Sequence, residues 1–112
     1  MPKPQQVPHS RYSRDAVRLL GLMIRNARIE RQLTAEQLAE RAGVSRGLVQ
    51  RVEKGDLGSS IGAAFELAAI VGVPLFDATQ QSLTSHIERE RHTQSLLPRT
   101  VHLPKKEVMD DF

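Results

Sequence analysis

Residues 33–55 read LTAEQLAERAGVSRGLVQRVEKG, and this stretch decides the fold. Thr34 lies three residues before Gln37, the spacing of a capping box, so we expect a helix to begin directly after Thr34. Gly43 tolerates a positive φ and is expected to end that helix, and Ser45 is expected to cap the next one. The apolar residues at inward-facing spacing are Leu38, Ala39, Ala42, Val49 and Val52. The stretch therefore predicts two short helices joined by a tight turn, the helix-turn-helix pattern.

Three further helices are expected in the same domain. One spans residues 14–31, with Ser13 as its cap and apolar residues at helical spacing. Another covers Ile61–Val71, and Pro74 suits the first turn of a fifth short helix that contains Phe76. The predicted fold class is therefore all-α, with a compact five-helix domain.

The segments on either side of this domain differ from it in composition. Residues 1–13 contain three of the six Pro and little to bury, so we expect a flexible N-terminal arm before a domain at residues 14–82. Residues 83–112 form a C-terminal extension, in which residues 83–91 are able to continue as a charged helix. Thr100–Leu103, enclosed by two prolines, favours a short edge strand. Because a lone strand is unstable in water, a second copy of the chain would have to pair with it.

The composition bounds the class of protein. The chain has 112 residues, of which 39% are apolar, and its 16 Lys plus Arg against 13 Asp plus Glu give a net charge of +3. These values are typical of one small globular domain. Cys is absent, which excludes disulfides and thiolate chemistry and indicates a cytoplasmic protein. The most apolar stretch, residues 63–76, is interrupted by Glu66, Gly72 and Pro74, so we expect no membrane span and no signal peptide.

The residue pattern does not support an enzyme. The four histidines are scattered without the spacing of metal ligands: His9, His86, His92 and His102. No Gly-rich phosphate loop and no Ser-His-Asp arrangement can be assembled. We therefore expect no catalytic residue, no metal site and no cofactor.

The helix-turn-helix stretch resembles the lambda-repressor-like, XRE-type DNA-binding domains. The resemblance is carried by residues 33–45, by Val52-Glu53-Lys54-Gly55 and by a later helix that ends Gly72-Val73-Pro74. It covers residues 16–77. It implies a five-helix domain that binds double-stranded operator DNA as a homodimer.

In such a domain, the helix after Ser45 enters the major groove, where small or polar side chains let the helix axis approach the bases. Arg46 is the best candidate for guanine, because its planar fork matches the O6 and N7 acceptors. Gln50 is suited to adenine. The predicted base-contacting residues are Ser45, Arg46, Gly47, Gln50 and Arg51. The alternative for these side chains is a solvated helix face without a ligand.

Phosphate contacts are expected from helix ends beside the groove, where they fix the position of the protein without reading sequence. The predicted phosphate-contacting residues are Arg25, Ala35, Arg41, Lys54 and Gly55, with Ala35 and Gly55 acting through backbone amides. The resemblance also implies a structural salt bridge between Arg28 and Glu53, which would tie the first helix to the end of the third.

The C-terminal residues suggest a partner protein. Met109 and Phe112 are apolar anchors among acidic residues, a composition typical of segments that become ordered on a partner. The order of an XRE-type domain, a short strand and a terminal peptide is similar to that of HipB-type antitoxins. This resemblance implies a bacterial protein that dimerises through the strand, represses its own operon and binds a HipA-like kinase toxin. Two alternatives are a stand-alone phage-type or metabolic repressor and an interaction adaptor whose helix-turn-helix does not bind DNA.

Overall fold

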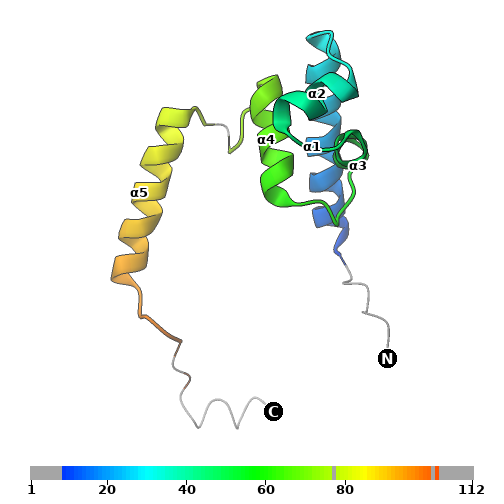
Figure 1. Ribbon diagram of the computed structural model, residues 1–112. Helices are drawn as coiled ribbons and strands as arrows, with labels where there is room; N and C mark the ends of the chain where they lie inside the picture. The colour runs from blue at the N-terminus through cyan, green and yellow to red at the C-terminus, as the bar shows by residue number, and fades with distance from the viewer. Residues whose placement is uncertain (1–8, 77, 102, 104–112) are drawn as a thin grey trace. The chain divides into compact units, whose positions relative to one another are not determined.

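The computed structural model describes residues 9–76, 78–101 and 103 of the chain. Within these ranges it has no β-sheet and five helices, which Figure 1 labels: α1 (Arg11–Glu30), α2 (Ala35–Ala42), α3 (Arg46–Glu53), α4 (Ile61–Val71) and α5 (Gln80–Leu96). The chain divides into two compact units between residues 77 and 78, with α1–α4 in the first unit and α5 in the second. The predicted all-α fold with five helices is confirmed.

The helix ends around the central turn follow the local sequence. The Thr34 Oγ1 accepts the Gln37 N–H at 3.0 Å, and the Gln37 Oε1 accepts the Thr34 N–H at 2.9 Å, so the predicted capping box is present. Gly43 ends α2 with a φ of 69°, in the left-handed region. Ser45 then caps α3, since its Oγ accepts the Leu48 N–H at 3.1 Å. The predicted starts of both helices are confirmed.

The predicted start of the first helix was wrong by three residues. Ser10, not Ser13, is the N-cap of α1, because the Ser10 backbone is extended and its Oγ accepts the Ser13 N–H at 3.1 Å. The helix ends at Glu30, one residue before the predicted end, with Arg31 as its C-cap. The predicted flexible arm therefore overlaps α1 at its last three residues, and residues 1–8 lie outside the described part of the chain.

The predicted short helix at Pro74 is absent. Phe76 has a φ of +56°, which cannot continue a right-handed helix, and its side chain is 76% exposed. Its ring packs edge-on against Phe65, with 6.2 Å between the ring centroids. The fifth helix is instead α5, which Thr79 caps by accepting the Ser82 N–H at 3.1 Å. It contains residues 83–91, which the sequence left able to form a charged helix.

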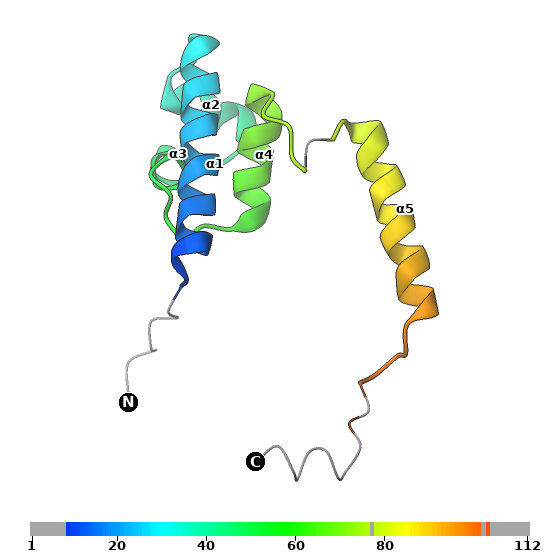
Figure 2. The ribbon, with the colours of Figure 1, turned by 180° about the vertical axis from the view of Figure 1, so that it is seen from behind.

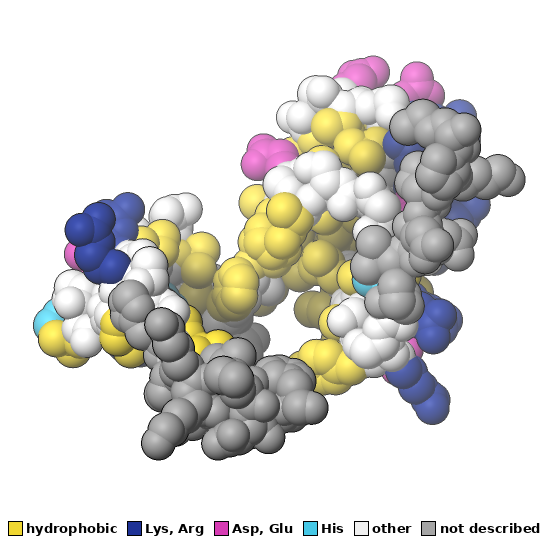
Figure 3. All heavy atoms as spheres, turned by 90° about the horizontal axis from the view of Figure 1, so that it is seen from below, with side chains coloured by type: hydrophobic (Ala, Val, Ile, Leu, Met, Phe, Trp, Pro, Cys, Tyr) yellow, Lys and Arg dark blue, Asp and Glu magenta, His cyan; other side chains and the backbone are white. Residues whose placement is uncertain are grey.

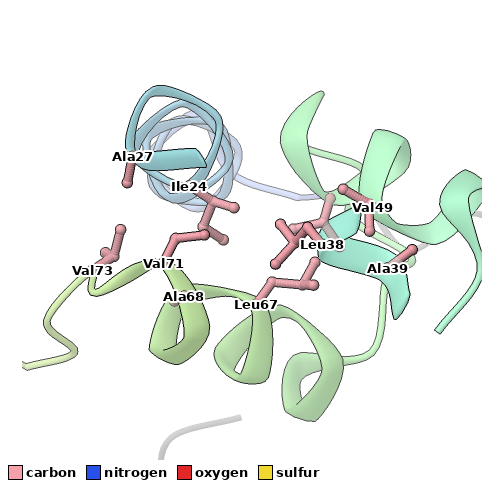
Figure 4. Close-up of a cluster of buried hydrophobic side chains, with 10 residues drawn as sticks. Ile24, Ala27, Leu38, Ala39, Val49, Leu67, Ala68, Val71 and Val73 are labelled. Atoms are coloured by element: carbon pink, nitrogen blue, oxygen red, sulfur yellow. The ribbon is translucent and has the colours of Figure 1, made fainter. Parts of the chain in front are cut away.

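The core of the first unit draws side chains from α1, α2, α3 and α4. Figure 4 shows Ile24 of α1, Leu38 of α2 and Leu67 of α4 directed toward one another. The buried hydrophobic residues in the described ranges are Ile24, Ala27, Leu38, Ala39, Val49, Val52, Leu67, Ala68, Val71 and Val73. Full burial of one large aliphatic side chain is worth about 1.5–3 kcal/mol, so this cluster holds α2 and α3 in a fixed relation to α1 and α4.

The C-terminal extension has little to bury. No residue of α5 is buried. The expected dimer strand covers Thr100, Val101, His102 and Leu103; the structure gives no strand at Thr100, Val101 or Leu103, and His102 lies outside the described residues. The pairing of this segment with a second copy of the chain stays a prediction.

Candidate nucleic-acid interface

α3 turns one side to the core and the other to the surface. Val49, Val52 and Glu53 are buried. On the outer side, Ser45, Arg46, Gln50 and Arg51 are exposed, and Gly47 is half-buried. The structure therefore places the five predicted base-contacting residues together at the N-cap and on the outer side of α3, and all except Gly47 are exposed.

The two side chains best suited to base contact are not engaged elsewhere. Within the described part of the chain, neither Arg46 nor Gln50 forms an ion pair or a side-chain hydrogen bond. Ser45 fixes the first turn of α3 through its capping bond, so Arg46 projects from a defined backbone position. A free guanidinium on a fixed backbone can form a bidentate contact without first breaking another bond.

Arg51 is held along the surface of α3. Its Nε lies 3.8 Å from the Asp56 Oδ2, and both side chains are largely exposed. One guanidinium nitrogen lies 3.3 Å from the position that a Cβ on Gly47 would occupy. The absence of a side chain at Gly47 therefore leaves room for Arg51. Because an exposed ion pair is worth about 0.2–1 kcal/mol, Arg51 can leave Asp56 at low cost.

A shallow depression of about 210 Å³ brings four of the predicted DNA-contacting residues together. Its lining residues belong to α1, α2, α3 and the C-cap of α3: Arg25, Arg28, Ala35, Gln50, Glu53 and Lys54. Arg25, Gln50 and Lys54 are exposed, and Ala35 is half-buried. Since Arg28 and Glu53 neutralise each other, the two free cations Arg25 and Lys54 make the depression a candidate anion site.

The ion pair between Arg28 and Glu53 that the resemblance implied is present. The Arg28 Nε and Nη2 donate to the two carboxylate oxygens of Glu53 at 2.7 and 3.0 Å, and only 12% and 6% of the two side chains are exposed. The Arg28 Nη1 also donates to the Leu33 carbonyl at 2.8 Å. The hydrogen bonds to Glu53 raise the pKa of Arg28 above its ordinary value. The pair therefore connects the end of α1, the loop before α2 and the end of α3.

Backbone amides contribute at one of the two predicted positions. At the start of α2, the capping box uses the N–H groups of Thr34 and Gln37, which leaves those of Ala35 and Glu36 for an outside acceptor. The Gly55 N–H, in contrast, already donates to the Val52 carbonyl at 3.0 Å. The predicted phosphate contact through the Gly55 amide therefore requires that bond to be shared.

Arg41 stands apart from the depression. It is exposed in the last turn of α2, which has eight residues. The first turn of the same helix lines the depression through Ala35. Its role as a phosphate contact stays a prediction. Met109 and Phe112, predicted to bind a partner, lie outside the described residues.

Sequence reasoning missed the residue that sets the distance between α1 and α3. Gly21 is buried in the middle of α1, and a Cβ there would collide with the Val52 carbonyl oxygen and lie 2.8 Å from that of Glu53. A helix-interior glycine is costly relative to alanine, by about 1 kcal/mol, and this cost was the available signal. Gly21 lets the backbone at the end of α3 pack directly against α1.

The same described ranges contain no group of three or more His, Cys, Asp or Glu residues able to hold a metal ion. No helix in them combines the length and the apolar character needed to cross a membrane.

Residues 24–77 match a family model described as helix-turn-helix, from the middle of α1 to just beyond α4. No curated protein matches the chain.

Proposed function

We propose that this chain, whose residues 24–77 carry a helix-turn-helix domain of the XRE or lambda-repressor kind, is a sequence-specific, double-stranded DNA-binding repressor that acts as a homodimer. The family match supports a DNA-binding transcription regulator, a class that is typically non-enzymatic. The proposal depends on one observation: α3 exposes Arg46 and Gln50, which form no ion pair or side-chain hydrogen bond with any described residue, and Gln50 lines the same depression as Arg25 and Lys54.

The two parts of this surface suit different parts of DNA. Arg46 and Gln50 are the side chains that pair with guanine and adenine edges in the major groove. Arg25, Lys54 and the free amides at the start of α2 suit a phosphate oxygen beside that groove. A single placement of α3 in the groove would therefore use both parts of the surface.

The first experiment selects binding sites for the full chain from random duplex DNA and then titrates salt against the selected duplex. We expect steep salt dependence, because each phosphate neutralised by Lys or Arg contributes about 0.9 to the slope of log affinity against log salt. Lys54→Ala should lower that slope by about 1. Failure to enrich any sequence, or binding that ignores salt, would favour the interaction adaptor instead.

The proposed biological role is that of a HipB-type antitoxin in the bacterial cytoplasm, which represses its own operon and neutralises a HipA-like kinase toxin. This proposal is supported by the order of helix-turn-helix domain, Thr100–Leu103 and a terminal segment with Met109 and Phe112. Co-purification of the chain from its native operon, followed by mass spectrometry, should recover a kinase. Deletion of residues 110–112 should weaken that association, and recovery of no partner would favour a stand-alone repressor.

The proposed dimer uses Thr100–Leu103 as a strand paired across two copies. Val101→Pro removes a backbone donor from the centre of this segment, so it should shift the protein toward monomer in analytical ultracentrifugation. An unchanged sedimentation profile would place the dimer surface elsewhere.

A further inference from the structure

α1 carries a second apolar face besides the one in the core. Its buried residues are Gly21, Ile24 and Ala27. Five large hydrophobic side chains of the same helix are exposed, by 85%, 58%, 50%, 40% and 47%: Tyr12, Leu19, Leu22, Met23 and Ile29. Tyr12 and Leu19 are seven residues apart, as are Leu22 and Ile29, while Leu22 and Met23 follow Leu19 by three and four residues. The five side chains therefore lie along one side of the helix. We call these five residues the α1 stripe; it is about 25 Å long at 1.5 Å per residue.

None of the other helices of the first unit covers the α1 stripe. Leu22 and Ile24 are two positions apart, which places them on opposite sides of α1. α3 and α4 contact the side of Ile24. Figure 2 shows α1 in front of α2–α4, with its near side uncovered by them. Seen from below, hydrophobic side chains reach the surface among charged ones, without assignment to single residues (Figure 3). Several large apolar side chains exposed on one side of a helix mark an interaction site.

A row of arginines follows one edge of the α1 stripe. Arg11, Arg18 and Arg25 are each seven residues apart and exposed. Arg18 approaches Gly55 at the end of α3, where its Cγ lies 2.8 Å from a Cβ placed on that glycine. Only Arg11 has an acidic partner within the described residues, Asp15 at 3.8 Å, and that pair is open to water. The edge therefore keeps a positive charge along the length of the stripe.

We propose that the α1 stripe is a docking surface for an acidic, amphipathic helix of a partner protein. In heptad terms, Tyr12 and Leu19 occupy a positions, Leu22 and Ile29 occupy d positions, and the three arginines occupy g positions. Asp15 and Asn26 occupy the remaining d and a positions, so the seam is polar at those two points and apolar at the other four. The four apolar positions, with Leu19 and Leu22 at the centre, fit the apolar face of one further helix. Three arginines beside the seam select a helix that carries Glu or Asp along its edge.

The charges disfavour a second copy of α1 as the occupant. Antiparallel pairing of two α1 helices brings g positions together, so Arg11, Arg18 and Arg25 would meet arginines of the other copy. Parallel pairing brings the d positions together, so Asp15 would face Asp15 of the other copy inside the seam. Like charges at such positions are destabilising. An acidic helix avoids the first of these problems, because its carboxylates would lie opposite the three arginines.

Docking at the α1 stripe would compete with DNA. Arg25 belongs both to the arginine edge and to the depression proposed to bind phosphate. A carboxylate of the docked helix on Arg25 would remove one cation from the phosphate site. This consequence rests on the proposed function, whereas docking itself depends only on the α1 surface.

The test uses the full chain and two synthetic three-heptad peptides with Leu at the a and d positions. One peptide has Glu at all e and g positions and the other has Lys. We expect the Glu peptide to bind, measured by fluorescence anisotropy, and the Lys peptide not to bind. Leu19→Ser with Leu22→Ser should weaken binding about tenfold or more, because the buried apolar area is lost. Leu96→Ser, which removes a side chain that is 72% exposed on α5, is the matched control and should change nothing.

A charge swap tests the arginine edge. Arg11→Glu with Arg18→Glu and Arg25→Glu should reverse the preference, so that the Lys peptide binds and the Glu peptide does not. Equal binding of both peptides, binding of neither, or a concentration-dependent dimer that Leu19→Ser with Leu22→Ser dissolves would overturn the proposal.

DNA affinity is measured in parallel. The Glu peptide should lower the DNA affinity of the unmodified chain only. If no DNA binds at all, the proposed function fails while the peptide result stands.

Discussion

Gly21 decides how closely α3 can approach α1. Because the end of α3 packs against the backbone of Gly21, any Cβ at that position displaces the helix that carries Arg46 and Gln50. The sequence shows a glycine at a helical position but gives no sign of what lies against it. Such close backbone approaches depend on residues far apart in the chain, here Gly21 and Val52, so they appear only in the folded structure.

The first prediction concerns Gly21→Ala. The new Cβ collides with backbone oxygens that cannot rotate away, so we expect a loss of about 1–3 kcal/mol in the free energy of unfolding by urea. Gly62→Ala is the matched control, since a Cβ on Gly62 meets only the Ser60 Oγ at 3.8 Å; it should stabilise by up to about 1 kcal/mol. Equal midpoints for the two variants would contradict this account of the contact between α1 and α3.

The second prediction concerns Glu53→Ala. Removal of the carboxylate leaves Arg28 with its charge nearly buried, so we expect a loss of about 3 kcal/mol in the free energy of unfolding. The raised pKa of Arg28 means that its contribution is complete below the ordinary guanidinium pKa and is lost only above it. The loss caused by Glu53→Ala should therefore be the same at neutral and mildly alkaline pH.

A matched variant separates burial from charge. Asp15→Ala breaks the pair with Arg11, in which 92% of the Arg11 and 61% of the Asp15 side chain are exposed, so it should cost less than about 1 kcal/mol. A comparable loss for Glu53→Ala and Asp15→Ala would show that burial of the ion pair has no part in stability.

At the scale of elements, local residues predict some helices and fail for others. Both ends of α2 and the start of α3 followed from Thr34, Gln37, Gly43 and Ser45, because these residues cap the helices locally. The sequence analysis predicted Ser13 as the cap of α1, whereas Ser10, three residues earlier, is the N-cap. The short helix expected at Pro74 is absent, because Phe76 has a positive φ and its ring packs on that of Phe65.

The sequence likewise predicts one part of the candidate site and not the other. The exposed face of α3 was predictable, since Ser45, Arg46 and Gln50 alternate with buried valines on one short helix. The depression was not, because it joins Arg25 of α1 to Lys54, residues that only the packing of α1 on α3 brings together. The hydrogen bond that engages the Gly55 N–H was likewise hidden, as it depends on the turn that ends α3.

The third prediction concerns α5. This helix has 17 residues and buries none of them, and a helix of that length is marginal in water without packing. We therefore expect its amides to exchange with solvent much faster than those of Ile24, Leu38 and Leu67 in the core, measured by hydrogen exchange and NMR on the protein free of DNA. Protection of α5 equal to that of the core would show that another molecule covers it.

At the scale of the whole molecule, one compact unit carries both proposed surfaces. The face of α3 proposed to contact DNA and the α1 stripe lie on the unit built by α1–α4. Arg25 lines the depression beside the first surface and belongs to the arginine edge of the second. The net charge of only +3 does not reveal the local positive charge of these surfaces, because acidic residues elsewhere offset the local cations. Binding at either surface is therefore expected to depend on local charge and not on the charge of the chain as a whole.

The central claim is that α3 presents Arg46 to the bases of duplex DNA, and one affinity comparison tests it most directly. Arg46→Ala and Arg91→Ala, which removes an exposed arginine of α5, are measured by fluorescence anisotropy on a selected duplex and on an unrelated one. We predict that Arg46→Ala weakens binding to the selected duplex about tenfold or more and has much less effect on the unrelated duplex, while Arg91→Ala leaves both affinities unchanged. Equal losses for the two variants on the selected duplex, or no loss for Arg46→Ala, would contradict the claim.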